Sequence, residues 1–183
     1  MKTLSGHLLV ASTELPDPNF AQTVVLVVEH DENGALGVVL NRPSNYTLKE
    51  IWEQVTDQAC DSEQPLNLGG PLVGPLMAVH TVDFIADKGI LPGVYFSTDK
   101  DSLLKLVGQN HQPYRIFTGY SGWGKGQLDG EVANGDWLVT PATVESIFAG
   151  GDDPWEVAVR DIKDQELIRA LRIRHVPVDP SAN

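Results

Sequence analysis

The stretch from Gly119 to Glu131 constrains the fold of this chain more than any other segment. Five glycines there alternate first with Tyr120 and Trp123 and then with polar residues. Glycine loses more backbone entropy on folding than any other residue, and an ordinary loop gains nothing from burying large aromatic rings. The pattern therefore predicts a tight turn with positive φ angles, held against the core by its two rings.

The net charge argues against one large class of partner. The 183 residues include 13 Lys and Arg against 25 Asp and Glu, which gives a net charge of −12. Such a chain repels the phosphate backbone of nucleic acids unless its basic residues cluster. The densest basic group lies between residues 169 and 175, and its simplest interpretation is a solvated helix face. Direct binding of nucleic acid is therefore not expected.

The cysteine, histidine and hydropathy patterns indicate which cell compartment and which metal or redox chemistry to expect. Cys60 is the single cysteine, so neither an intramolecular disulfide nor a paired-cysteine metal or redox site is available. The five histidines lack metal-ligand spacing. No window approaches the roughly 20 apolar residues of a membrane span, and residues 1–11 make a poor secretory signal. We expect a cytoplasmic protein without a metal, cofactor or membrane anchor, and the sequence leaves its oligomeric state open.

Hairpins mixed with helices predict an α+β fold. Apolar runs predict strands at 4–11, 23–28, 35–40, 76–82, 94–96, 114–118 and 137–139. Caps and apolar spacing predict helices that begin near residues 47, 98, 127, 141 and 154. This order differs from a regular βαβ alternation and favours a largely antiparallel or mixed sheet. We expect one domain over residues 1–175 and a mobile tail over 176–183.

Two catalytic motifs almost match the glycine stretch. Gly119, Gly124 and Lys125 reproduce most of a phosphate-binding loop, but Gly126 stands where a Ser or Thr would hold Mg²⁺. The start of the stretch also approaches the G-x-S-x-G nucleophile elbow, but Trp123 occupies the last glycine position. The sequence thus holds no recognisable catalytic constellation. The enzyme question stays open, and the residues favour a non-catalytic role.

Polar groups and glycines gather at predicted strand ends, where ligand sites tend to form. Arg42 offers a guanidinium fork suited to carboxylate or phosphate, while Gln127 and Glu131 stand four residues apart on a predicted helix and can face one pocket. An ion pair to an acidic neighbour and an exposed polar helix face are the respective structural alternatives. The predicted binding groove consists of Asn41, Arg42, Gly69, Gly70, Tyr120, Trp123, Gln127 and Glu131.

Five blocks in the chain, taken in order, resemble the AlgH/YqgE family, an uncharacterised protein family of the UPF0301 type. The blocks are Asp17-Pro18-Asn19-Phe20, residues 25–31, residues 34–43, Gly69-Gly70-Pro71 and residues 119–128. The resemblance runs from about residue 4 to residue 159. It implies a single α+β domain of coiled, bifurcated, mostly antiparallel β-sheets flanked by helices. It implies no catalytic residues.

Several functions compete at this stage. The leading hypothesis is a cytoplasmic binding or regulatory module whose groove takes an unknown protein or a small anionic ligand. The second is an enzyme acting on a small anionic or phosphorylated metabolite, with Arg42 as anion clamp and Glu131 as acid or base. Some family members are labelled transcriptional regulators, but the acidic charge and the lack of a helix-turn-helix signal disfavour that reading. The glycine and aromatic blocks could also serve only to shape the fold.

Overall fold

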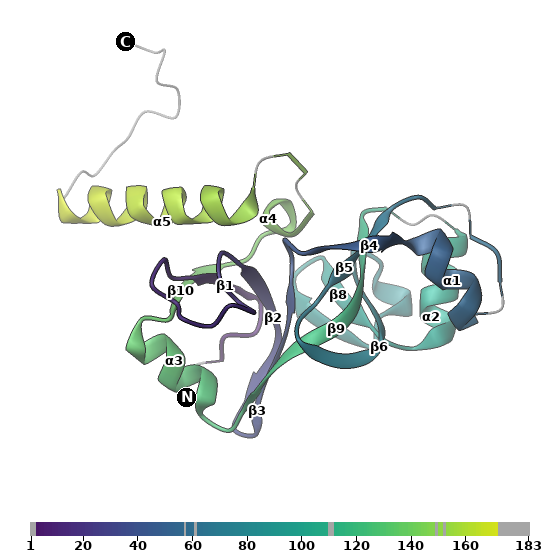
Figure 1. Ribbon diagram of the computed structural model, residues 1–183, viewed down its shortest axis with the longest axis horizontal. Coiled ribbons are helices and arrows are strands. Elements are labelled where there is room, and N and C mark those ends of the chain that lie inside the picture. Colours follow the sequence, from purple (N-terminus) through teal and green to yellow (C-terminus); the bar gives the residue numbers. More distant parts are fainter. Residues whose placement is uncertain are drawn as a thin grey trace, which may run out of the picture.

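In the computed structural model, which describes residues 3–56, 58–60, 62–109, 112–148, 150–151 and 153–171, one strand joins two lobes (Figure 1). The strands are β1 (His7–Ala11), β2 (Val24–Asp31), β3 (Gly34–Val39), β4 (Pro43–Thr47), β5 (Pro65–Leu68), β6 (Leu72–His80), β7 (Lys88–Leu91), β8 (Val94–Ser97), β9 (Tyr114–Gly124) and β10 (Trp137–Pro141). The helices are α1 (Leu48–Thr56), the 3₁₀ turn η1 (Asp83–Ile85), α2 (Lys100–Gly108), α3 (Gln127–Asn134), α4 (Val144–Phe148) and α5 (Pro154–Ala170).

Strand β9 connects the two parts of the sheet. Its first part, up to Tyr120, pairs with β6, and its last part, from Ser121 to Gly124, pairs with β3. The sheet order is β10-β1-β2-β3-β9-β6-β8-β7, and β5 lies beside β9 and carries β4 on its other side. Only the β5–β9 pairing is parallel among the described strands. The expected α+β fold with a bifurcated, mostly antiparallel sheet is confirmed.

The core consists of apolar side chains on both faces of the central strands. Leu26 and Val28 of β2 belong to one cluster, and Val25 and Val27 belong to another on the opposite face. Successive side chains in a strand point to opposite faces, so a strand covered on both sides reads as a continuous apolar run. A third cluster, which includes Trp52, lies where α1 and α2 cover the other lobe.

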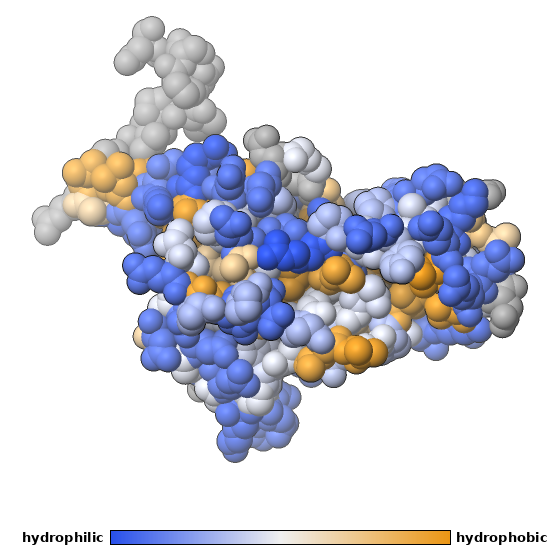
Figure 2. All heavy atoms as spheres, in the orientation of Figure 1, coloured by the Kyte–Doolittle hydropathy of each residue, from blue (hydrophilic) through white to orange (hydrophobic). Residues whose placement is uncertain are grey.

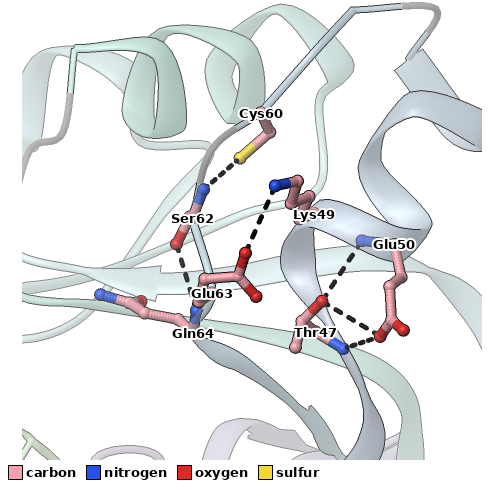
Figure 3. Close-up of polar contacts among 7 residues, drawn as sticks. All are labelled: Thr47, Lys49, Glu50, Cys60, Ser62, Glu63 and Gln64. Atoms are coloured by element: carbon pink, nitrogen blue, oxygen red, sulfur yellow. Dashed lines mark hydrogen bonds and ion pairs between the residues drawn. The ribbon is translucent and has the colours of Figure 1, made fainter.

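Local capping chemistry sets the ends of the helices. At the start of α1, the Thr47 backbone N–H donates to a Glu50 carboxylate oxygen at 2.7 Å, and the Glu50 N–H donates to the Thr47 hydroxyl at 3.3 Å (Figure 3). This is a reciprocal capping box, and it agrees with the predicted start of a helix near residue 47. Asp99 accepts from Ser102 N at 3.0 Å to cap α2. Gly135, with φ of 83°, ends α3 in the left-handed conformation.

The glycine stretch does not form the tight turn that we expected. Strand β9 continues through it as far as Gly124, and only two of its glycines, Gly119 and Gly126, have positive φ. Close packing explains two of the five glycines, Gly119 and Gly122. A Cβ on Gly119 would lie 2.8 Å from the Leu72 carbonyl oxygen, and one on Gly122 would lie 2.9 Å from the Leu72 side chain. The strand therefore needs small residues where it crosses from one lobe to the other.

Several further expectations are corrected or fall outside the described residues. Strands β4, β5 and β7 were not predicted from the sequence. Pro141 ends β10 rather than starting a helix, and α4 begins at Val144. The predicted mobile tail over 176–183 lies outside the described residues, as do the last basic residues before it.

Helix α5 lies along one side of the molecule with little cover. None of its side chains is fully buried, and Leu167 and the adjoining Leu171, which follows the last helical residue, are more than half exposed. Figure 2 shows hydrophobic residues gathered at the C-terminal end of this helix, on a face that is otherwise mostly hydrophilic. Within the described part of the chain, no helix has the length and apolar character needed to cross a bilayer.

Candidate functional site

Asn41 and Arg42 hold the backbone that leads into β2. The Asn41 side chain accepts from Val24 N at 2.9 Å and donates to the Gln22 carbonyl at 2.8 Å. One guanidinium nitrogen of Arg42 donates to the Ala21 carbonyl at 2.5 Å. Both side chains are half-buried. These contacts give the pair a structural role at the end of β3.

Gly69 and Gly70 lie where β5, β3 and β9 meet. The Gly69 carbonyl accepts from Val39 N at 2.9 Å and from the Ser121 hydroxyl at 3.1 Å. A Cβ on Gly69 would lie 2.2 Å from the Gly119 carbonyl oxygen, so a larger residue cannot occupy this position without displacing backbone. Tyr120 is half-buried, and its ring lies against Gly74 of β6.

Trp123, Gln127 and Glu131 converge on one another. The Trp123 indole Nε1 donates to Glu131 Oε2 at 2.8 Å, and Gln127 Nε2 donates to Glu131 Oε1 at 2.9 Å. Gln127 also accepts from Gly124 N at 3.0 Å, which fixes the start of α3 against the end of β9. The expectation that Gln127 and Glu131 share one face of a helix agrees with this geometry.

Two residues that the sequence analysis did not place in the site complete it. Trp137 on β10 donates its indole N–H to the same Glu131 Oε2 at 2.8 Å. Phe20 stacks on Trp123, with ring centroids 6.1 Å apart at 25°, and meets the edge of Trp137 at 5.5 Å and 74°. The two tryptophans are themselves edge to face at 6.2 Å. Three rings and one carboxylate thus form a single cluster.

A hollow of about 220 Å³ opens in front of this cluster. Its walls come from the connection before β2, from the end of β9, from α3 and from the start of β10. The lining includes three carboxylates, and it includes no Lys, Arg or His. We call it the aromatic pocket, defined by Asp17, Phe20, Trp123, Gln127, Glu131, Asp136 and Trp137.

The Glu131 carboxylate is a preorganised acceptor. A carboxylate offers about four lone-pair directions. Two are occupied at Oε2 by indole N–H groups and one at Oε1 by Gln127. Oε1 keeps acceptor capacity for a further donor at the pocket. Side chains held in this way can recognise a ligand without reorganising first.

The predicted residues therefore divide into separate groups. Within the described part of the chain, no hydrogen bond or ion pair joins Arg42 to Glu131, and their partners lie on different elements. Gly69 and Gly70 are enclosed by backbone. Of the eight residues predicted for the groove, Trp123, Gln127 and Glu131 line one pocket.

A buried serine–histidine pair lies in the other lobe. His80 and Ser97 are fully buried, and His80 Nε2 lies 2.9 Å from the Ser97 hydroxyl. The Ser97 hydroxyl donates to the Ile85 carbonyl at 2.8 Å, and Val82 N donates to His80 Nδ1 at 3.2 Å. The serine proton therefore points away from the imidazole, which is the wrong direction for activating a nucleophile. Burial lowers the pKa of His80 despite the nearby Asp87.

Comparisons with known proteins point to one family. Residues 8–166 match a protein-family model described as AlgH-like. A UPF0301 protein of Chlorobium limicola is 39% identical over 171 residues, 87% of each chain, and one of Myxococcus xanthus is 37% identical over 168 residues, 87% of this chain and 91% of that one.

Two solved structures have the same fold. The solution structure of the AlgH protein from Pseudomonas aeruginosa aligns with a TM-score of 0.75 at 30% identity, over 97% of this chain and 100% of that one. The crystal structure of a protein from Corynebacterium diphtheriae aligns with a TM-score of 0.71 at 26% identity, over 88% of each chain. These matches confirm the resemblance carried by the five sequence blocks.

Proposed function

Since this chain belongs to the AlgH-like family of uncharacterised UPF0301 proteins, we propose from its own geometry that it is a binding or regulatory module whose ligand enters the aromatic pocket. The observation that carries the proposal is the Glu131 carboxylate, which two indole N–H groups and one amide hold in place beside a hollow. Ligand pockets typically combine apolar walls with a few fixed polar groups. This pocket has that composition.

A purely structural role explains the cluster less well. The Glu131 side chain is only half-buried, and joining the two indoles uses acceptor positions at Oε2 alone. Glu131 sits between two tryptophans and keeps unused acceptor capacity at Oε1. A group fixed in this way beside a hollow is suited to receiving a donor from outside the chain.

The competing functions receive less support. The enzyme hypothesis requires Arg42 and Glu131 to contact the same substrate. Arg42 instead donates to the Ala21 carbonyl, and Glu131 accepts from two indole N–H groups. An anionic ligand in the aromatic pocket would meet three carboxylates and no basic side chain. Direct action on DNA stays disfavoured by the net charge of −12. The lone cysteine, Cys60, supports a reducing compartment such as the cytoplasm for this module.

A thermal-shift screen tests the proposal. The compounds would be nucleotides, sugar phosphates, small acids, amines and guanidines, and the proteins would be the wild type, Phe20→Ala and Arg42→Ala. Phe20 contributes a pocket wall, whereas Arg42 lies outside the lining. The proposal predicts ligand-induced shifts that Phe20→Ala loses and a folded Arg42→Ala retains. Shifts that survive in Phe20→Ala but vanish in Arg42→Ala would place the ligand at the end of β3 instead.

A further inference from the structure

Resting on the proposed function of the same pocket, we propose that its ligand presents a guanidinium group. The three carboxylates of the lining, Asp17, Glu131 and Asp136, stand without any Lys, Arg or His among the lining residues. Opposite charges attract strongly where low-dielectric walls replace water. The net charge of −12 adds a field that draws cations toward the molecule and repels anions. The ligand should therefore carry a positive charge.

The three carboxylates are available to different degrees. Glu131 keeps acceptor capacity at Oε1, as described above. Asp17 uses Oδ1 to accept from Asn19 N at 2.8 Å, which leaves its second oxygen. Asp136 is half-buried, and its side chain has no hydrogen-bond or ion-pair partner within the described residues. Acceptors on separate walls of one pocket suit a ligand group with several N–H donors.

The aromatic walls favour a flat cation. Phe20 is the least buried ring of the cluster and stacks on Trp123. Cations bind over aromatic faces, and a guanidinium also stacks there because it is planar. Its five N–H groups lie in one plane and can reach more than one carboxylate at once. An ammonium group matches the charge of the pocket, but it is a compact, strongly hydrated point charge without this planar shape.

A hollow of about 220 Å³ holds only a small group. A free guanidine compound and an arginine side chain on a protein segment share the required chemistry. Acetyl-arginine amide represents the first source, and a short peptide with one central arginine represents the second. Acetyl-citrulline amide has nearly the same shape as the first probe but carries no charge.

Isothermal titration calorimetry at low ionic strength tests the inference on the full chain. We expect acetyl-arginine amide to bind at least about tenfold more tightly than acetyl-citrulline amide, because the neutral group loses the charge interaction. Asp136→Asn should weaken arginine binding by roughly three- to tenfold. The matched control is Asp101→Asn on the exposed face of α2, which removes the same charge far from the pocket and should change nothing. Circular dichroism verifies that both variants fold.

The outcomes separate the inference from the function on which it rests. If the peptide binds more tightly than the amide, the guanidinium group comes from an arginine of a protein partner. If the two bind equally, it comes from a free guanidine compound. Either result supports the inference. Equal binding of the arginine and citrulline probes, or equal losses in Asp136→Asn and Asp101→Asn, overturns it. If a neutral or anionic compound binds in a manner that Phe20→Ala abolishes, the pocket binds ligands but the inference is wrong. If no compound shows Phe20-dependent binding, both are wrong.

Discussion

The indole nitrogen of Trp123 donates a 2.8 Å hydrogen bond to the carboxylate of Glu131. Trp123 is the last residue but one of the long strand β9, and Glu131 lies on helix α3. Because Trp137 donates to the same oxygen, this carboxylate also ties β10 to the other two elements. One acidic side chain therefore fixes the relative positions of a strand, a helix and a second strand, and it also forms part of a pocket wall.

Removal of this acceptor should destabilise the fold. Glu131→Ala leaves two buried indole N–H groups without their partner, so we expect the free energy of unfolding to fall by about 2–4 kcal/mol. Glu131→Gln keeps a carbonyl oxygen for the indoles and should cost less than Glu131→Ala. Urea denaturation measures both. Glu53→Ala, on the exposed face of α1, is the control and should change stability by less than about 0.5 kcal/mol. Similar small losses in Glu131→Ala and the control would contradict the account.

Any side chain at Gly69, where β5 meets β9, should destabilise the fold. A Cβ there would lie 2.2 Å from the Gly119 carbonyl oxygen. We expect Gly69→Ala to lower the free energy of unfolding by at least about 2 kcal/mol, since backbone must move to accommodate the methyl group. Gly130→Ala inside helix α3 has open space around its Cβ and should raise stability by about 0.5–1 kcal/mol. Thermal denaturation of both variants measures the two changes in stability. An unchanged stability in Gly69→Ala would show that β5 and β9 are not tightly packed at this position.

His80 should make stability depend on pH. Burial lowers its pKa in the folded chain, whereas the unfolded chain has the ordinary value of about 6.5. The neutral imidazole therefore contributes its full stabilisation above pH 6.5 or so, and this contribution falls as the pH drops from there toward the folded pKa. Urea denaturation between about pH 7.5 and pH 5.5 measures the fall.

The histidine can also be followed directly. An NMR titration of the His80 ring in the folded chain should give a midpoint below the ordinary histidine value of about 6.5. This measurement needs no variant, so it stands even if replacing the buried ring prevents folding. A midpoint at or above the ordinary value would show that burial does not control this group.

The capping box of α1 should contribute a modest and separable amount of stability. Thr47→Ala removes the hydroxyl that accepts from Glu50 N, so the free energy of unfolding should fall by about 1 kcal/mol. Thr47→Ser keeps the hydroxyl and should recover most of the loss. Chemical denaturation of the two variants compares them. Equal destabilisation by alanine and serine would mean that the methyl group, rather than the cap, is what matters at this position.

Local signals made much of the fold predictable. The run before Glu29 reads as a strand buried on both faces, and the structure places its alternate residues in two core clusters. Thr47, Asp99 and Gly135 mark helix ends by chemistry that needs only neighbouring residues. The path of β9 was not predictable in the same way. Gly119 and Gly122 are needed because Leu72, which is distant in sequence, packs against them, and such packing leaves no local periodic pattern.

The candidate site was predictable only in part. Gln127 and Glu131 are four residues apart on one helix, so sequence spacing alone predicts that they face together. Trp137 and Phe20 join them through the long-range order of the sheet, in which β10 pairs with β1 and β1 pairs with β2. Arg42 carries a typical anion-binding group, but whether its donors meet a ligand or the Ala21 carbonyl depends on that same tertiary arrangement.

The most direct test of the proposed site uses the four tryptophans as reporters. Trp123 and Trp137 line the aromatic pocket, whereas Trp52 lies in another core cluster and Trp155 donates to the Ala11 carbonyl. Each indole N–H gives one NMR signal, which single Trp→Phe variants assign. On titration with acetyl-arginine amide, the account predicts that the Trp123 and Trp137 signals shift while those of Trp52 and Trp155 stay fixed. A shift confined to Trp155 or Trp52, or no shift of any indole up to the highest probe concentration, would contradict a guanidinium ligand in this pocket.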